Sequence, residues 1–117
     1  MLCSDCLFCK IIQKKIPADI VYEDDNILGF NDINPQAPVH VLFIPKNRHI
    51  EKISDIKKED HEIIGQLVSA ANKIAKKNNI VDDGFRLVFN CNKNAGQAVF
   101  HIHLHLLGGR IFSWPPG

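Results

Sequence analysis

The chain has 117 residues, of which 45% are hydrophobic and 23% are charged. This composition is typical of a soluble globular protein, so we expect one domain over residues 1–117 and no extended disorder. The formal net charge of +1 supplies no basic surface for nucleic acid or an anionic membrane, and the apolar runs are too short to span a bilayer.

The N-terminal segment MLCSDCLFCKII lacks a charged lead followed by a long apolar stretch. We therefore expect no secretion signal and a cytoplasmic location, where cysteines stay reduced. The four cysteines are then interpreted as packing residues, metal ligands or thiols rather than disulfides. Cys3, Cys6 and Cys9 share CxxCxxC spacing, and one CxxC pair supplies half of a tetrahedral zinc site.

The first half of the chain predicts a short helix followed by three strands. The helix covers residues 6–14 and ends before Pro17, because proline cannot continue it. Strands are expected at residues 19–23, 27–33 and 39–45. The third strand is almost wholly apolar, which indicates a central strand covered on both faces.

The second half predicts one long helix and two further strands. The helix begins after Ser54, a favourable N-cap residue, and ends near Asn78. Its apolar residues recur at helical spacing and form one buried stripe: Ile63, Ile64, Leu67, Val68, Ala71, Ile74 and Ala75. Strands are expected at residues 85–90 and 98–109. Five strands with short connections favour an α+β fold, with an antiparallel sheet and the helix on one face.

His101, His103 and His105 occupy every second position of the last predicted strand. Because side chains alternate between the faces of a strand, the three imidazoles are expected to line one face. The intervening apolar residues would fill the other face and pack on the helix: Phe100, Ile102, Leu104 and Leu106. Imidazole is both a metal ligand and a nucleophile, so the row is compatible with either chemistry. In the preceding loop, Gly96 would let backbone N–H groups approach a phosphate.

The motif His101-Ile-His103-Leu-His105-Leu-Leu resembles the signature of the histidine triad (HIT) superfamily. The similarity extends to CLFCKIIQKKIPADIVYEDD, to FNDINPQAPVHVLFIPK and to the GGR…WPPG end, and so covers nearly the whole chain. It is similar to the nucleotide-binding branch whose members are nucleoside phosphoramidases. The resemblance implies the HIT-like fold, an α+β domain with a five-stranded antiparallel sheet, one long and one short helix, and a two-fold homodimer.

The resemblance also implies a reaction, hydrolysis of the P–N bond of purine nucleoside 5'-phosphoramidates. His103 would attack the phosphorus and form a nucleotidyl-histidine, which water then hydrolyses; a neutral imidazole is a suitable nucleophile for this step. His105 would contact the phosphate and protonate the leaving amine as a histidinium. His101 would lie beside the nucleophile, and His40 would orient its surroundings.

The nucleotide-binding residues are implied in the same way. Asp32 would accept hydrogen bonds from the ribose hydroxyls. The other positions would form the base walls and hold the phosphate and leaving group of an AMP or GMP moiety: Phe8, Ile11, Phe30, Ile33, Asn90, Gly96, Gln97, Ala98 and Val99. Ala98 departs from the family, whose members often carry a polar residue there, and this departure concerns the preference for the leaving group. Trp114 would reach the active site of the neighbouring subunit.

Relatives with this CxxC pair bind structural zinc, and the implied ligands here are Cys6, Cys9, His49 and His101, with Cys3 able to replace Cys6. The reaction itself would need no cofactor. The alternative is a set of reduced thiols packed near the N-terminus. Two alternative functions also stay open: a dinucleoside polyphosphate hydrolase, against which the WPPG tail argues, and a non-catalytic nucleotide-binding regulator, against which the intact histidine row argues.

Overall fold

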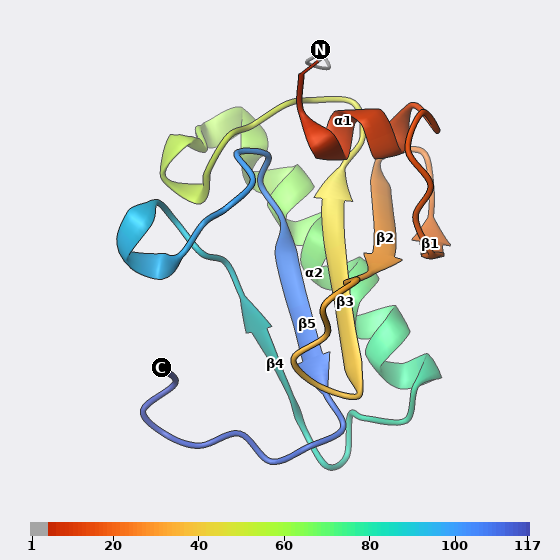
Figure 1. The fold of residues 1–117 in the computed structure, drawn as a ribbon, viewed down its shortest axis with the longest axis vertical. Helices are drawn as coiled ribbons and strands as arrows, with labels where there is room; N and C mark the ends of the chain where they lie inside the picture. Colours follow the sequence, from red (N-terminus) through yellow and green to blue (C-terminus); the bar gives the residue numbers. More distant parts are fainter. Residues whose placement is uncertain (1–4) are drawn as a thin grey trace.

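The structure, a computed structural model, describes residues 5–117, so Cys3 lies outside the described residues. Five strands form one antiparallel sheet in the order β1-β2-β3-β5-β4 (Figure 1). Their bounds are β1 Ile20–Glu23, β2 Ile27–Asn31, β3 Val39–Pro45, β4 Phe85–Val88 and β5 Leu104–Gly108. The helices are α1 (Leu7–Ile12) and α2 (His61–Lys77). The predicted α+β architecture is confirmed, and β3 is the central strand of the sheet.

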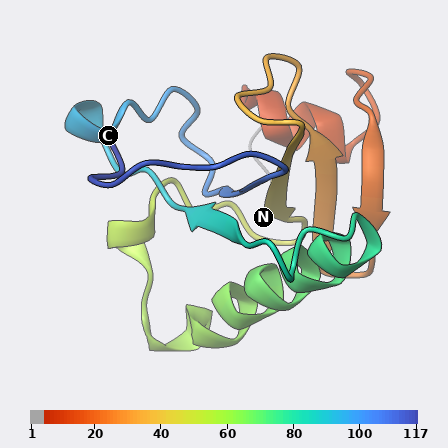
Figure 2. The same cartoon turned by 90° about the horizontal axis from the view of Figure 1, so that it is seen from below.

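The two helices pack on opposite faces of the sheet, with α2 covering one face along much of its length (Figure 2). Alternation along β3 divides the core accordingly. Val41 and Phe43 belong to the cluster under α2, whereas Leu42 and Ile44 belong to the cluster under α1. Every polar side chain that shares the face of Leu42 therefore points toward the α1 side of the sheet.

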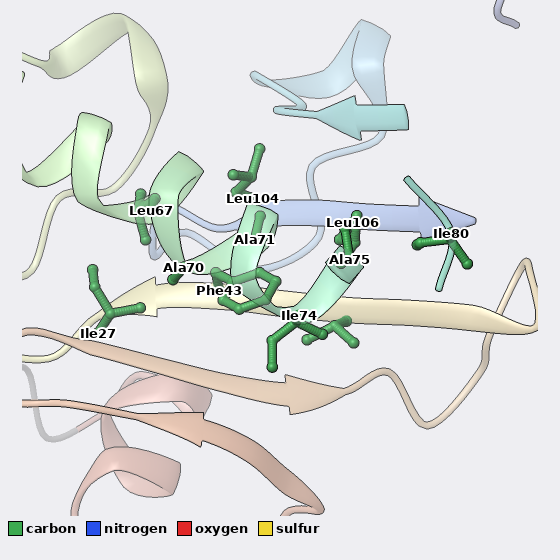
Figure 3. Close-up of a cluster of buried hydrophobic side chains, with 11 residues drawn as sticks. Ile27, Phe43, Leu67, Ala70, Ala71, Ile74, Ala75, Ile80, Leu104 and Leu106 are labelled. Carbon is green, nitrogen blue, oxygen red and sulfur yellow. The ribbon is translucent and has the colours of Figure 1, made fainter. Parts of the chain in front are cut away.

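The cluster under α2 is the larger of the two, and Figure 3 shows Phe43 of β3 beside Ala70 and Ala71 of the helix. The apolar stripe predicted for the helix is confirmed, with Leu67, Ala71 and Ala75 fully buried. The small alanines let the helix approach the sheet closely. Replacing Leu67 by alanine would leave a cavity and cost about 2–5 kcal/mol of stability. None of the helices in residues 5–117 has the length and apolar character needed to span a membrane.

The predicted start of the long helix at Ser54 is wrong, because α2 begins at His61. Residues 53–60 instead form two short 3₁₀ turns separated by the extended Ile56. The carboxylate of Asp60 is fully buried, accepts a hydrogen bond from the Lys57 N–H at 2.9 Å and forms an ion pair with Arg48. The bonds of the Asp60 carboxylate stabilise the 3₁₀ turn that precedes α2. The α-helix therefore begins after Asp60 and does not include residues 54–60.

The predicted last strand is also too long, because β5 contains only Leu104–Gly108 and leaves out residues 98–103. The ladder between β3 and β5 ends at the pair of Phe43 and Leu104. The carbonyl of Pro45 accepts a hydrogen bond from the His101 ring at 3.2 Å, and the Ile102 N–H donates to the Ile50 carbonyl at 2.6 Å. Phe100, expected under the helix, is 45% exposed.

Candidate active site

A pocket of about 350 Å³ opens on the α1 side of the sheet. Its lining contains nearly every residue predicted to bind nucleotide: Phe8, Ile11, Phe30, Asp32, Ile33, Asn90, Gly96, Ala98, Val99, His103 and His105. The sequence interpretation missed six further lining residues: Leu7, Ile16, Pro17, Ala18, Asn31 and Leu42. These are mostly apolar residues that a sequence pattern cannot distinguish from core, since only the fold shows which of them border a cavity.

Strand register brings the polar groups of the pocket together. His105 pairs with Leu42 across β5 and β3, and His40 lies two residues before Leu42, so both imidazoles share the α1 face. Asp32 follows Phe30 at the same spacing, just beyond the end of β2, and its carboxylate lies 3.5 Å from His40 Nε2. One face of three neighbouring strands thus supplies a carboxylate and two imidazoles.

Gln97, predicted to hold the phosphate, is absent from the pocket lining. Its side chain is buried and bonds only to backbone: Oε1 accepts from the Asn92 N–H, and Nε2 donates to the carbonyls of Glu51 and Val99 at 2.8 and 3.1 Å. These bonds close the loop over residues 92–97, in which Gly96 adopts the left-handed region at φ 76°. Gln97 therefore shapes the loop that borders the pocket.

His103 is oriented by the carbonyl of its neighbour. The ring Nδ1 lies 2.8 Å from the His101 carbonyl oxygen, which assigns a proton to Nδ1 and leaves the lone pair on Nε2. The ring meets Phe8 edge to face at a centroid distance of 5.1 Å. Burial lowers the pKa of His103 below its usual value, so the imidazole stays neutral at about pH 7. A neutral ring with an available nitrogen is the form in which histidine acts as a nucleophile.

His40 and His105 form a hydrogen-bonded pair with a defined proton order. The backbone N–H of Gln36 donates to His40 Nδ1 at 3.0 Å, so the proton of a neutral His40 lies on Nε2. That nitrogen is 2.9 Å from His105 Nδ1, which must then accept, and the His105 proton lies on Nε2. Within the described chain the buried Nε2 of His105 has no hydrogen-bond partner. Burial, followed by the neighbouring His103, lowers the pKa of His105 to about 4.

Four side chains predicted as metal ligands also meet. The ligand atoms of Cys6, Cys9, His49 and His101 all lie within 4.8 Å of one another. His101 Nδ1 is 3.4 Å from Cys6 Sγ and 3.5 Å from Cys9 Sγ, and His49 Nδ1 is 3.4 Å from Cys9 Sγ. Because the other nitrogen of His101 donates to the Pro45 carbonyl, Nδ1 is unprotonated and faces the two thiols. This cluster could hold a metal ion.

Asp32, His40 and His105 bring together a second set of possible ligand atoms within 4.8 Å. The proton order opposes a metal there. Since the Gln36 N–H occupies Nδ1 of His40, a metal at Nε2 would have to displace the only ring proton of a neutral imidazole. The two clusters therefore differ in chemistry, although both contain histidine.

Three backbone groups that order these imidazoles could not be read from the sequence. They are the N–H of Gln36 and the carbonyls of Pro45 and His101. Every residue except proline carries an N–H, and every residue carries a carbonyl, so residue type gives no signal for such a role. Their importance appears only when the loop between β2 and β3 and the end of β3 are placed beside the histidines.

The fold and the site define the class: a small α+β domain whose antiparallel sheet carries a helix on each face and a pocket lined by an oriented imidazole. The family model described as "Scavenger mRNA decapping enzyme C-term binding" matches residues 5–111. A histidine triad protein from Clostridium difficile is 42% identical and covers 97% of each chain, with a TM-score of 0.92. The chain belongs to the histidine triad family, as its motif predicted.

Two relatives bear on activity. The purine nucleoside phosphoramidase of Escherichia coli K12 is 47% identical over 109 residues, which cover 93% of this chain and 91% of the relative. A HIT family hydrolase from Legionella pneumophila Philadelphia 1 is 54% identical, with a TM-score of 0.94, over 97% of this chain and 100% of that one. Both alignments cover more than nine tenths of this chain.

Proposed function

We propose that this protein is a purine nucleoside phosphoramidase, which hydrolyses the P–N bond of nucleoside 5'-phosphoramidates. The observation that carries the proposal is the hydrogen bond from His103 Nδ1 to the His101 carbonyl, which leaves Nε2 as a nucleophile in the pocket. The similarity to the phosphoramidase of Escherichia coli supports the same assignment. The apolar lining near Phe8 and Phe30 suits a purine ring, and Asp32 suits the ribose hydroxyls.

In the first step, Nε2 of His103 attacks the α-phosphorus, the new P–N bond to the imidazole forms and the P–N bond to the amine breaks. The leaving amine takes the electron pair of the broken bond and needs a proton. His105 can donate from Nε2–H to the phosphate or the amine, because its Nδ1 already accepts a hydrogen bond from His40 and its Nε2 has no other partner among the described residues. The negative charge of a bound phosphate raises the pKa of His105 from about 4, so the pair of His40 and His105 takes up one proton from solvent as the substrate binds, and His105 Nε2 passes a proton to the leaving amine.

In the second step, water attacks the same phosphorus and the bond to His103 Nε2 breaks. The imidazole regains its lone pair, and the nucleoside monophosphate leaves. The attacking water loses its proton to His105, and this proton is released to solvent as the nucleoside monophosphate leaves, which restores the neutral pair. Splitting one displacement into two suits a poor leaving group such as an amine.

The test is mass spectrometry of the protein mixed with an AMP-amine substrate and quenched during turnover. We expect a nucleotidyl adduct on His103 and steady release of AMP. Faster turnover of diadenosine tetraphosphate than of the phosphoramidate would instead assign a dinucleoside polyphosphate hydrolase. Tight AMP binding with no adduct and no turnover would assign a non-catalytic nucleotide-binding regulator.

We further propose that the Cys6, Cys9, His49 and His101 cluster holds structural zinc. Tetrahedral zinc with bonds of about 2.3 Å to sulfur and about 2.05 Å to nitrogen places these ligand atoms about 3.5 Å apart. The sulfur–nitrogen distances of 3.4–3.5 Å in the cluster agree with that geometry before any ion is added. The zinc would supply a fixed crosslink between α1 and the histidine segment and no step of the reaction. Ligation requires reduced thiols, which supports a cytoplasmic location.

The last part of the proposal is a two-fold homodimer in which Trp114 reaches the neighbouring active site. Trp114 is 82% exposed and Ile111 is 94% exposed, an unusual pair of large apolar side chains on one tail. Burial against a second subunit would remove both from water. Sedimentation of the protein and of Trp114→Ala tests this, since a dimer that persists with lowered activity is the expected result.

A further inference from the structure

Arg110 lies outside the pocket, yet it contacts the loop that orders the catalytic imidazoles. It follows the end of β5, and its Nε–H donates to the carbonyl of Gln36 at 2.9 Å. Gln36 is 74 residues away along the chain. The N–H of the same residue is the group that donates to His40 Nδ1 at 3.0 Å.

The contact continues from Gln36 into the pocket. His40 Nε2 lies 2.9 Å from His105 Nδ1, and the unpaired Nε2 of His105 is the donor assigned to the phosphate and leaving amine. Arg110, Gln36, His40 and His105 thus form one series of hydrogen bonds from the protein surface to the reacting atoms. The bond from Arg110 holds the backbone at Gln36 in place, and the two bonds that follow set which nitrogen of His40 and of His105 carries the proton.

Arg110 is itself held in place. Its guanidinium stacks over the Phe112 ring at 4.2 Å from the centroid, and one Nη donates to the Ile111 carbonyl at 3.0 Å. Gly109 adopts a left-handed φ of 89° and approaches Pro38 so closely that a Cβ would lie 2.9 Å from the proline ring. The turn at Gly109 therefore packs the start of the C-terminal tail, residues 109–117, closely against the loop of residues 36–38.

We propose that Arg110 is a positioning residue for the phosphoramidase reaction, which holds the backbone at Gln36 so that the Gln36 N–H stays on His40 Nδ1 and keeps the proton order of His40 and His105. The inference rests on the proposed function. Arg110 is not among the residues that line the pocket, so we expect its loss to lower kcat and to leave KM nearly unchanged.

Three substitutions distinguish the effect of the Arg110 Nε–H, which donates to the Gln36 carbonyl, from the effect of the positive charge of Arg110. Arg110→Met removes both, and we expect kcat to fall about fivefold to tenfold, as befits one hydrogen bond near the surface. Arg110→Gln places its amide nitrogen at the same distance along the side chain as the arginine Nε, and we expect it to recover kcat to within about twofold of the original protein. Arg110→Lys keeps the charge without a donor at that position, and it should resemble Arg110→Met.

The matched control is Arg86→Met. Arg86 also lies over the Phe112 ring, at 5.1 Å, but it donates to the Ser113 carbonyl and makes no bond to the loop. We expect it to leave kcat unchanged. Equal losses in Arg86→Met and Arg110→Met, or no recovery in Arg110→Gln, would overturn the proposal, because either result assigns the effect to the tail as a whole.

A measurement without substrate completes the test. Nitrogen-15 NMR of the imidazoles should show His40 protonated at Nε2 alone in the original protein and in Arg110→Gln, and mixed tautomers in Arg110→Met. A single unchanged tautomer in Arg110→Met overturns the inference, whatever the kinetics. Failure of the original protein to hydrolyse the phosphoramidate overturns the proposed function instead, so the two failures are distinguishable.

Discussion

Two histidine clusters lie next to each other on the α1 side of this protein, and they are prepared for different chemistry. In the cysteine cluster, formed by Cys6, Cys9, His49 and His101, one ring nitrogen donates to a carbonyl and the bare nitrogen faces two thiols. The pocket cluster is formed by Asp32, His40, His103 and His105. There, a backbone N–H donates to one nitrogen of His40, and the other nitrogen of His40 carries the proton and donates it in a hydrogen bond to His105. The residue type is shared, and the groups that surround each ring decide its role.

The comparison teaches that the position of the ring proton distinguishes an imidazole suited to bind a metal from one suited to the proposed reaction. His101 and His103 are separated by one residue, yet the carbonyl of the first orients the second. The clusters also share α1, because Phe8 stands between Cys6 and Cys9 in the chain and packs on His103. Each cluster can therefore be disturbed by itself, and the effect on the other can be measured.

The largest effect is expected at the nucleophile. His103→Ala should lower kcat/KM on the order of 10⁴-fold while AMP still binds, because the covalent route is lost and the pocket walls remain. Steady-state kinetics with the AMP-amine measure kcat/KM, and titration calorimetry with AMP measures the binding. Metal content, measured on the same sample, should be unchanged. A variant that still turned over at a tenth of the original rate would assign the nucleophile elsewhere.

The next effect is expected in the cysteine cluster. Cys9→Ser should abolish stoichiometric zinc and lower the Tm by roughly 10 °C, because a structural metal contributes its binding free energy to folding. Elemental analysis and calorimetry measure these changes. Cys91→Ser is the control, since Cys91 lies near Ser54 at 3.4 Å and outside the cluster. His105→Gln should retain full zinc; a loss of zinc there would contradict the separation of the two clusters.

A smaller effect is expected at the residue that the clusters share. Phe8→Leu should raise KM for the nucleotide substrate about fivefold to tenfold, because it removes an aromatic wall of the pocket. Zinc content should stay the same. Ile12→Ala, on the same helix but absent from the pocket lining, controls for loosening of α1. Equal changes in both variants would mean that KM reports helix stability and not contact with the base.

The smallest effect concerns pH. Burial lowers the pKa of His101 and of His105 to about 4, whereas an unfolded histidine titrates near 6.5. Between those values the unfolded chain binds more protons than the folded one, so the unfolding free energy of the metal-free protein should fall as the pH falls from about 6.5 to about 4. The slope should be at most about 1.4 kcal/mol per pH unit for each histidine. His105→Gln should reduce this slope in urea titrations, and the exposed His61 replaced by glutamine should not.

Much of the fold followed from local patterns. The apolar run at 39–45 matches β3, and the helical stripe around Leu67 and Ala71 is buried as its spacing requires. The boundaries failed where side chains distant in sequence intervene. Arg48 and Asp60 pair before α2, and the Pro45 carbonyl bonds to His101 before β5. Ser54 and residues 98–103 carried no local sign of these contacts.

The sequence by itself determined the family, the antiparallel sheet implied by short connections, and the inventory of groups in each cluster, because residue type and spacing encode them. Only the tertiary structure decided which nitrogen of each imidazole carries its proton, that Gln97 braces a loop, and that Arg110 reaches the Gln36 peptide. The physical reason is that these roles depend on backbone carbonyls and N–H groups, which every residue supplies alike until the fold places a particular one within hydrogen-bond distance.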